Sequence, residues 1–319
     1  MVLKVVVNGY FRSGTTFVWS FLKDSMTKDY VCFFEPLQQE IATSIQREKQ
    51  EKTKDKLLNK FLWQEYIGLD EKTLHRLLIN HPSATNEGIY NEQALKNYLD
   101  IFHNLPNNIL LQPNRLHFFF NIIKKEYNPK IIHVIRHPLD VYLSMINVDK
   151  TVYENTCKKR KINYYLGLLI KKIFPSIRTT LGDFEVEKDY QWIRRHIGLP
   201  YVQEDSWKMK YFNHQSYFEK MIIVWTIANY YAIKSINQEK GYLLVYEELL
   251  QNPNKVTKEL EKYLEINIKN HPKVKQGNSF KFKKQKLSKL KKVITKYKLE
   301  EYFNYIIEEI KKREINYLK

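Results

Sequence analysis

The sequence has only two cysteines among its 319 residues, Cys32 and Cys157. Two cysteines cannot build a disulfide framework, and their spacing matches no metal-ligand motif. The sequence also lacks internal repeats and linkers rich in glycine and serine. We therefore expect a protein of a reducing compartment that folds as a single domain over residues 1–319.

Long hydrophobic runs are also missing. No window contains the roughly 20 consecutive apolar residues that a membrane-spanning helix needs. A strand-like pattern begins at once, from Leu3 to Val7, and leaves no room for a signal peptide. We therefore expect a cytoplasmic protein, with any membrane contact confined to its surface.

Acidic residues are absent from one long segment. Residues Ile266 to Leu299 contain twelve lysines and no Asp or Glu, and they supply two thirds of the net charge of +18. A basic excess of this size predicts an anionic partner, such as nucleic acid, acidic lipid or an anionic small molecule. The same lysines could instead form a solvated face.

The sequence does contain a regular alternation of strands and helices. Helical patterns are expected at 15–25, 116–127, 139–146 and 214–238, and short apolar runs predict strands at 3–8, 30–34, 109–112, 130–135 and 242–246. This order indicates an α/β fold, with helices on both faces of a central parallel sheet in three layers. Because ligands bind such sheets beyond the carboxyl ends of the strands, we expect one shared site there, formed by the Arg12 loop, Glu35, Gln112 and Arg136.

A phosphate-binding loop follows the first strand. Gly9 and Gly14 have the spacing of a P-loop, but Thr15 stands where a nucleoside-triphosphate site needs lysine, and Arg12 is the only cation in the loop. Backbone N–H groups at a helix N-terminus, together with the hydroxyls of Thr15 and Thr16, suit a tetrahedral anion. A triphosphate hydrolase would also want an acidic magnesium site at a neighbouring strand end, where this sequence has Arg136.

Several motifs in this order resemble the sulfotransferase family. The loop YFRSGTTF is similar to the 5′-phosphosulfate loop Y-P-K-S-G-T-T-W of cytosolic members, and VIRHPLDVYLSM resembles their 3′-phosphate motif through Arg136 and Ser144. LLVYEELLQNP resembles the Y-E-D-L segment, and NSFKF (278–282) is weakly similar to the adenine loop T-S-F-K-E-M. The resemblance runs from residue 5 to about 282 and implies a P-loop sulfotransferase-like fold.

The resemblance also implies a donor, 3′-phosphoadenosine 5′-phosphosulfate (PAPS), with adenosine 3′,5′-bisphosphate as product and no metal. Arg12 matches the loop lysine that contacts the transferred group. Phe17 stands where a family tryptophan stacks on adenine, although a helical phenylalanine is as often part of a core. The cofactor-binding residues implied in this way are Arg12, Ser13, Gly14, Thr15, Thr16, Phe17, Arg136, Ser144, Tyr246, Ser279 and Phe280. The basic tract could also hold the 3′-phosphate through Lys275 or Lys281.

The catalytic base departs from the cytosolic pattern. Asn114 stands in place of the histidine of the K-T-H motif, and an amide cannot accept a proton usefully near pH 7. Glu35, just past the second strand in FFEPL, matches the glutamate base of tyrosylprotein sulfotransferases and the F-E-P-L of Golgi carbohydrate sulfotransferases. Two alternatives stay open: Glu35 could complement a helix dipole before Pro36, and His117, expected on a helix, could be the base.

The acceptor would be bound by two insertions, at about 38–107 and 149–213, with Arg115 and His117 as candidate substrate-binding residues. The basic, partly apolar segment 157–178 could lie on a membrane surface or pack against the domain. These features predict transfer to a hydroxyl of a carbohydrate or glycolipid. A P-loop kinase or nucleotide-binding protein and a nucleic-acid-binding protein are the alternatives, of which nucleic acid is the less favoured partner.

Overall fold

The computed structural model describes residues 2–317, except 53, 56–57, 59, 83–89, 148–185, 187–188, 194–195, 198–213 and 269–283. Contacts between residues divide the chain into two compact units. The first comprises Met1–Arg136 and Tyr231–Gln276, and the second comprises His137–Tyr230 and Gly277–Lys319.

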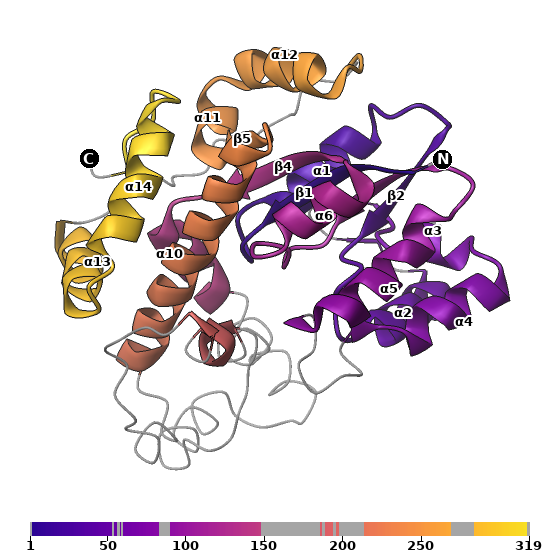
Figure 1. The fold of residues 1–319 in the computed structure, drawn as a ribbon, viewed down its shortest axis with the longest axis horizontal. Helices are drawn as coiled ribbons and strands as arrows, with labels where there is room; N and C mark the ends of the chain where they lie inside the picture. The colour runs from indigo at the N-terminus through magenta and orange to yellow at the C-terminus, as the bar shows by residue number, and fades with distance from the viewer. Residues whose placement is uncertain are drawn as a thin grey trace. The chain divides into compact units, whose positions relative to one another are not determined.

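The first unit is built around a five-stranded parallel sheet with the order β2-β3-β1-β4-β5 (Figure 1). The strands are short apolar runs whose side chains are mostly buried, as in sheets covered on both faces. Their bounds are β1 Leu3–Gly9, β2 Tyr30–Phe34, β3 Asn108–Gln112, β4 Lys130–Ile135 and β5 Tyr242–Val245. All four pairings are parallel, which confirms the predicted sheet.

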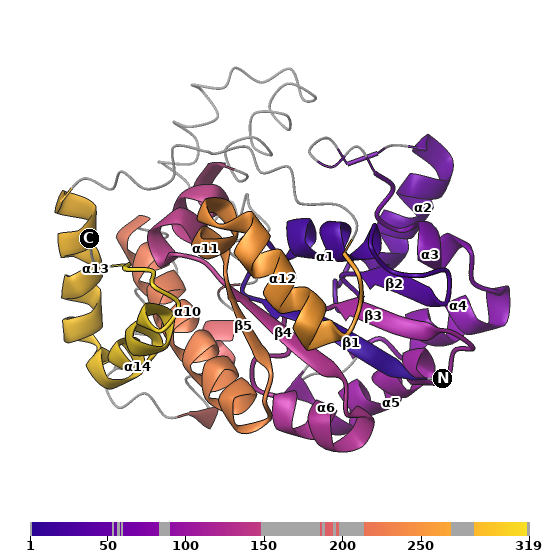
Figure 2. The same cartoon turned by 90° about the horizontal axis from the view of Figure 1, so that it is seen from above.

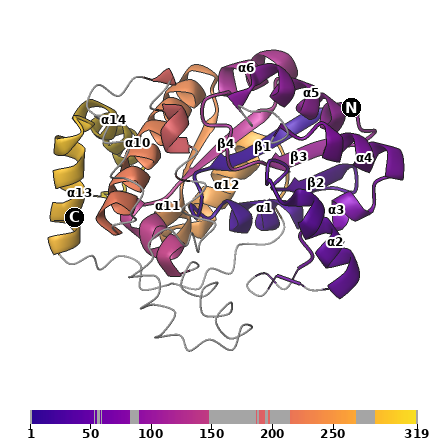
Figure 3. The same ribbon diagram turned by 90° about the horizontal axis from the view of Figure 1, so that it is seen from below.

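Helices cover both faces of this sheet. Helix α1 (Thr15–Lys23) lies on one face, and α5 (Glu92–His103) and α6 (Phe120–Tyr127) lie on the other (Figures 2 and 3). The Tyr127 hydroxyl donates to the Lys96 carbonyl and so joins α6 to α5. This is the three-layer α/β/α arrangement that the sequence predicts.

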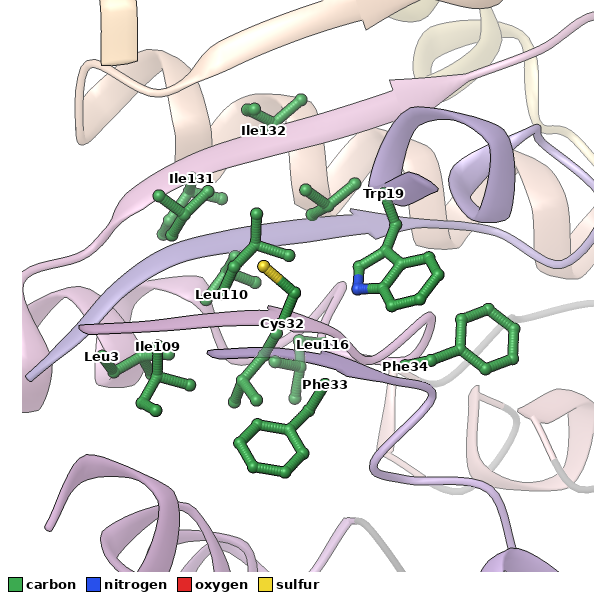
Figure 4. Close-up of a cluster of buried hydrophobic side chains, with 14 of the residues drawn as sticks. Leu3, Trp19, Cys32, Phe33, Phe34, Ile109, Leu110, Leu116, Ile131 and Ile132 are labelled. Atoms are coloured by element: carbon green, nitrogen blue, oxygen red, sulfur yellow. The ribbon is translucent and has the colours of Figure 1, made fainter. Parts of the chain in front are cut away.

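The core of the first unit lies between the sheet and its helices (Figure 4). Trp19 of α1, Phe33 of β2 and Ile132 of β4 are fully buried, and each such side chain contributes roughly 1.5–3 kcal/mol by leaving water. Cys32 is buried in the same cluster, and burial raises the pKa of its thiol to about 12. This thiol therefore stays protonated and serves as a small apolar side chain.

The polar stretch from residue 38 to 104 is largely helical where it is described, as its pattern predicts. Buried Glu48 accepts hydrogen bonds from the backbone N–H groups of Leu62 and Trp63, both at 2.9 Å, and so fixes the loop before α3. The remaining helices of the first unit are α2 Ile41–Glu51, α3 Gln64–Ile67, α4 Glu71–Ile79, α11 Tyr246–Gln251 and α12 Pro253–Leu264.

The second unit is helical in its described residues. It contains a helical segment at 138–147, most of α10 (His214–Gln238), α13 (Lys284–Lys296) and α14 (Glu300–Lys311). Leu290, Val293 and Ile294 of α13 are buried, whereas Lys286, Lys289, Lys291 and Lys292 are exposed. Among the helices described in either unit, none has the length and hydropathy required to cross a membrane.

Two of the predicted boundaries that bear on the site are wrong. Helix α6 begins at Phe120 and not at residue 116, because Leu116–Phe119 first form a turn in which the Leu116 N–H donates to the Asn8 side chain at 2.9 Å. His117 therefore lies in a turn. Strand β5 ends at Val245, and Tyr246 opens α11, whose first turn contains Glu247 and Glu248, the charge that a helix N-terminus favours.

Candidate active site

Polar residues follow all five strands at one edge of the sheet. The register pairs Phe34 with Gln112, Gly9 with Val134 and Ile135 with Val245, so the carboxyl ends of neighbouring strands lie level. The chain adds β2 and β3 on one side of β1 and then β4 and β5 on the other, and ligands bind at such a switch point. The residues that follow the strand ends are Glu35, Asn114, Arg12 to Gly14, Arg136 and Tyr246.

The loop between β1 and α1 requires both of its glycines. A Cβ at Gly9 would lie 2.6 Å from the Val134 carbonyl oxygen, and a Cβ at Gly14 would lie 2.4 Å from Cε2 of Tyr246. Gly14 also has φ 95°, the left-handed region, and it caps α1. The backbone is thereby turned so that the first N–H groups of α1, which have no intrahelical partner, face beyond the strand end.

The hydroxyls of this loop differ in their partners. The Ser13 Oγ is buried and has no hydrogen-bond partner among the described residues, so it can donate to an anion bound in the loop. The Thr15 Oγ1 donates to the Asn114 Oδ1 at 2.7 Å. Thr16 is half-buried beside them.

Two arginines meet at the open side of the loop. The Arg136 Nη1 donates to the Arg12 carbonyl at 3.2 Å, and the Arg136 guanidinium carbon lies 5.0 Å from the centre of the Tyr246 ring. Burial lowers the pKa of Arg12 and nearby Arg136 lowers it further, while Glu35 raises it. Guanidinium groups stay charged in proteins, so this is a site of concentrated positive charge suited to an anion with several charges.

Glu35 occupies an unusual turn after β2. Its φ is 40°, its N–H donates to the Gln112 carbonyl at 2.9 Å, and its Oε1 accepts from the Asn114 Nδ2 at 2.7 Å. The next helix, α2, begins only at Ile41, so Glu35 does not lie in the first turn of a helix. The helix-dipole alternative for Glu35 is therefore wrong.

Three buried side chains fix the backbone on either side of Glu35. The Tyr66 hydroxyl donates to the Phe34 carbonyl at 3.0 Å. The Pro36 carbonyl accepts from the Tyr98 hydroxyl at 2.6 Å and contacts the His81 Nε2 at 3.1 Å. The carboxylate is therefore carried by a backbone turn that is held from both sides.

Asn114 joins three neighbouring strand ends. It lies two residues after β3 with φ 61°. Its Oδ1 accepts from Thr15 and from the Gln112 Nε2, and its Nδ2 donates to Glu35. The predicted base and the predicted anion loop are thus linked through one amide.

The two candidate substrate-binding residues, Arg115 and His117, are buried in the segment that follows β3. The Arg115 guanidinium lies over the Phe11 ring, 4.9 Å from its centre. The His117 Nδ1 accepts from the Asn8 side-chain amide at 3.1 Å, which places the proton of the neutral ring on Nε2. Burial, with contributions from His133 and Arg115, lowers the pKa of His117 well below its usual range.

Phe17 and Tyr246 lie together beside Gly14. Their ring centres are 6.4 Å apart with an interplanar angle of 88°, an edge-to-face contact. Phe17 is half-buried and packs against the core at its edge. This position is compatible with both predicted roles, adenine stacking and core packing.

The other predicted cofactor residues fall outside the sheet unit or outside the described residues. Ser144 is half-buried on the helical segment 138–147 of the second unit. Ser279, Phe280, Lys275 and Lys281 lie outside the described residues, as does the predicted surface segment 157–178.

The residues that support the site were not predicted from the sequence. Tyr66, Tyr98 and His81 lie in the insertion that was assigned to the acceptor, and they hold the Glu35 turn instead. Asn114 was interpreted only as the replacement of the histidine that acts as base in cytosolic members. An available signal was its residue type, because asparagine two residues after a strand favours a left-handed turn.

Comparisons with known proteins found similar chains. A protein of Archaeoglobus fulgidus with no assigned function is 26% identical over 286 residues, which cover 84% of this chain and 85% of the relative. A sulfotransferase from Alicyclobacillus acidocaldarius has a TM-score of 0.41 and 12% identity, covering 95% of this chain and 96% of that one. Sulfotransferase STF9 from Mycobacterium avium has a TM-score of 0.42 and 10% identity, covering 97% of this chain and 76% of that one.

The family comparison covers nearly the whole chain. The family model described as the sulfotransferase domain matches residues 3–315, which include both compact units and every predicted site residue. This chain therefore belongs to the sulfotransferase family, and its reaction class is sulfuryl transfer.

Proposed function

We propose that this sulfotransferase moves a sulfuryl group from 3′-phosphoadenosine 5′-phosphosulfate to a hydroxyl of a carbohydrate or glycolipid. The observation that carries the proposal is the link from Thr15 in the anion loop, through Asn114, to the Glu35 carboxylate. A loop for a phosphosulfate and a base for a hydroxyl are the two parts that such a transfer needs, and the residues proposed for these two roles are joined here through the Asn114 amide.

The loop residues fit the donor. The buried Ser13 hydroxyl, which lacks a partner among the described residues, and the close backbone turn at Gly14 suit an anion with several oxygens. When bound, the donor would supply the sulfuryl group and a phosphate leaving group. Arg12 would neutralise charge on the leaving oxygens, as a positioned cation does. The residues proposed to hold the donor are Ser13 and Gly14 of the loop, Thr15, Thr16 and Phe17 at the start of α1, and Arg136, Ser144, Tyr246, Ser279 and Phe280.

Glu35 is the proposed general base. Its carboxylate is half-buried at a strand end beside Arg12, and it would take the proton from the acceptor hydroxyl as the oxygen attacks. His117 is less suited to this role because its ring is buried and its Nδ1 is engaged by Asn8.

The acceptor is proposed from chemistry and resemblance. The FFEPL turn resembles that of carbohydrate sulfotransferases, and the net charge of +18 suits an acidic glycan or the headgroup of an acidic glycolipid. Arg115 would contribute to binding through its position next to Asn114. A screen of hydroxyl compounds with sulfur-labelled donor identifies the acceptor directly.

Thermal unfolding with adenosine 3′,5′-bisphosphate tests the donor assignment without knowledge of the acceptor. A ligand at 100 times its dissociation constant stabilises a protein by about 2.7 kcal/mol, so a clear rise in Tm is expected. The rise should be equal with magnesium and with a chelator, and adenosine 5′-monophosphate should give a smaller one. Equal effects of the two nucleotides would contradict the proposal.

Nucleotide binding and DNA binding separate the proposed sulfotransferase from a P-loop kinase and from a nucleic-acid-binding protein. Strict dependence of nucleotide binding on a divalent ion would favour a kinase. The exposed lysines of α13 favour the nucleic-acid alternative, for which binding to random DNA should weaken steeply as salt rises.

A further inference from the structure

We propose that Asn114 is a positioning residue that keeps the Glu35 carboxylate ionised and ties it to the loop between β1 and α1. This inference rests on the proposed role of Glu35 as base. The family position holds a histidine in cytosolic members, so the sequence alone presents Asn114 as a lost function. The contacts of its amide indicate that Asn114 has a function of its own.

The Asn114 amide contacts three side chains. Its Oδ1 accepts from the Thr15 hydroxyl at 2.7 Å and from the Gln112 Nε2. An amide oxygen has two lone pairs, so these two donors occupy both. An ionised carboxylate can only accept hydrogen bonds, so the Nδ2 is the amide atom that faces Glu35, and it donates to the Glu35 Oε1 at 2.7 Å.

This direction matters for the base. The Nδ2 hydrogen bond to Oε1 is stronger when the Glu35 carboxylate is ionised, because the acceptor oxygen then carries negative charge. A hydrogen bond to the charged form favours that form and lowers the pKa of the acid. Asn114 therefore favours the state of Glu35 that can take a proton from the acceptor hydroxyl.

The backbone of Asn114 offers a competing explanation that can be separated from this one. At φ 61°, asparagine is among the few residues other than glycine that adopt the conformation readily, so Asn114 could be present for the turn alone. Replacement by glycine keeps the turn and removes the amide. Replacement by aspartate keeps the size and tolerates the turn, but it places a second carboxylate against Glu35.

The test is a titration of Glu35 that needs neither donor nor acceptor. The carboxyl carbons of glutamate are labelled with ¹³C in the full-length protein, and the Glu35 signal is identified by its loss in Glu35→Gln. In Asn114→Gly the Glu35 midpoint should rise by about one pH unit, because a hydrogen bond to the charged form is lost. In Asn114→Asp it should rise further, because two carboxylates then compete for ionisation.

Asn128→Gly is the matched control. Asn128 also has a left-handed backbone, with φ 48°, and it is exposed at the end of α6. The same substitution there should leave the Glu35 midpoint unchanged. If the midpoint of the Glu35 titration is unchanged in Asn114→Gly, the proposal is overturned. If the aspartate variant does not fold, the result for Asn114→Gly decides the test on its own. Retained turnover in Glu35→Gln would instead overturn the base assignment, and with it the catalytic meaning of Asn114.

Discussion

Glu35 has surroundings unlike those of an ordinary surface carboxylate. Its backbone is held by hydrogen bonds to Phe34 and Pro36 on either side, and its side chain is held by Asn114. A base fixed in this way loses little conformational entropy when the acceptor binds, which is the advantage of a preorganised site. The two predictions that follow concern single side chains at this edge of the sheet.

Replacing Glu35 by glutamine should remove basicity while keeping size. We expect kcat to fall by roughly 100-fold, the usual contribution of a general base, with little change in affinity for adenosine 3′,5′-bisphosphate. Labelled-donor assays and calorimetry measure the two quantities. Glu40→Gln, at an exposed position just before α2, is the control and should retain full turnover. Loss of turnover together with loss of nucleotide binding would indicate a collapsed site and not a missing base.

Replacing Arg136 by alanine should weaken binding of adenosine 3′,5′-bisphosphate. The loss of a charge-assisted contact to a phosphate predicts about 2 kcal/mol, measured by calorimetry. Arg76→Ala removes an exposed arginine of α4 and serves as the control for net charge. Unchanged affinity in Arg136→Ala would remove this residue from the proposed phosphate site.

At the scale of elements, the start of α1 depends on one glycine. Gly14→Ala would force a Cβ to within 2.4 Å of the Tyr246 ring and leave alanine at φ 95°. We expect loss of stabilisation by adenosine 3′,5′-bisphosphate in thermal unfolding, because either the loop or Tyr246 must move. Gly68→Ala is the matched control, since its Cβ would meet nothing closer than 3.6 Å. Normal nucleotide stabilisation in Gly14→Ala would show that the loop does not bind the anion.

The elements were more predictable than their contacts. The strands at 30–34 and 130–135 have the predicted bounds, because β-branched runs bounded by polar residues leave little ambiguity. The predicted start of α6 was wrong because the Leu116 N–H donates a hydrogen bond to the side chain of Asn8, a partner 108 residues away. The contact between Asn114 and Glu35 depends on the register of β2 against β3, which no local pattern specifies.

At the scale of the whole molecule, buried histidines couple stability to pH. Burial lowers the pKa of His81 from 6.5 to about 4, with a smaller contribution from Arg115. The unfolded chain binds the proton more tightly, so the stability that His81 contributes is complete above pH 6.5 and is lost as pH falls towards 4. His117 acts in the same direction.

This coupling can be measured by denaturant unfolding at pH 7.5 and pH 5. The His81 contribution predicts a loss of about 2 kcal/mol between these two pH values in the parent protein. His81→Gln should reduce that loss, whereas His75→Gln, at an exposed position of α4, should leave it unchanged. An equal pH dependence in the parent and in His81→Gln would contradict the assignment.

The acceptor is the property of the whole molecule that the sequence predicts least. The sheet edge follows from strand ends and glycine spacing, which are local. The proposed acceptor site depends on insertions whose packing is set by tertiary contacts. In one of them, 38–107, Tyr98 and His81 contact the Pro36 carbonyl next to Glu35. The family match over residues 3–315 shows the reaction class and leaves the acceptor to experiment.

Two residues at this edge of the sheet have left-handed backbones that reduce stability. Selection for activity and selection for thermostability should therefore favour different residues at these two positions. Arg12 and Glu35 have φ 63° and 40°, a conformation that costs about 1–2 kcal/mol for side chains other than glycine, asparagine or aspartate. Libraries screened only for heat resistance should therefore enrich glycine at positions 12 and 35, and sequencing of the survivors would show it. The same clones should lose sulfuryl transfer. A heat-resistant pool that keeps Arg12 and Glu35 while enriching other sites would mean that the surrounding hydrogen bonds already relieve the strain.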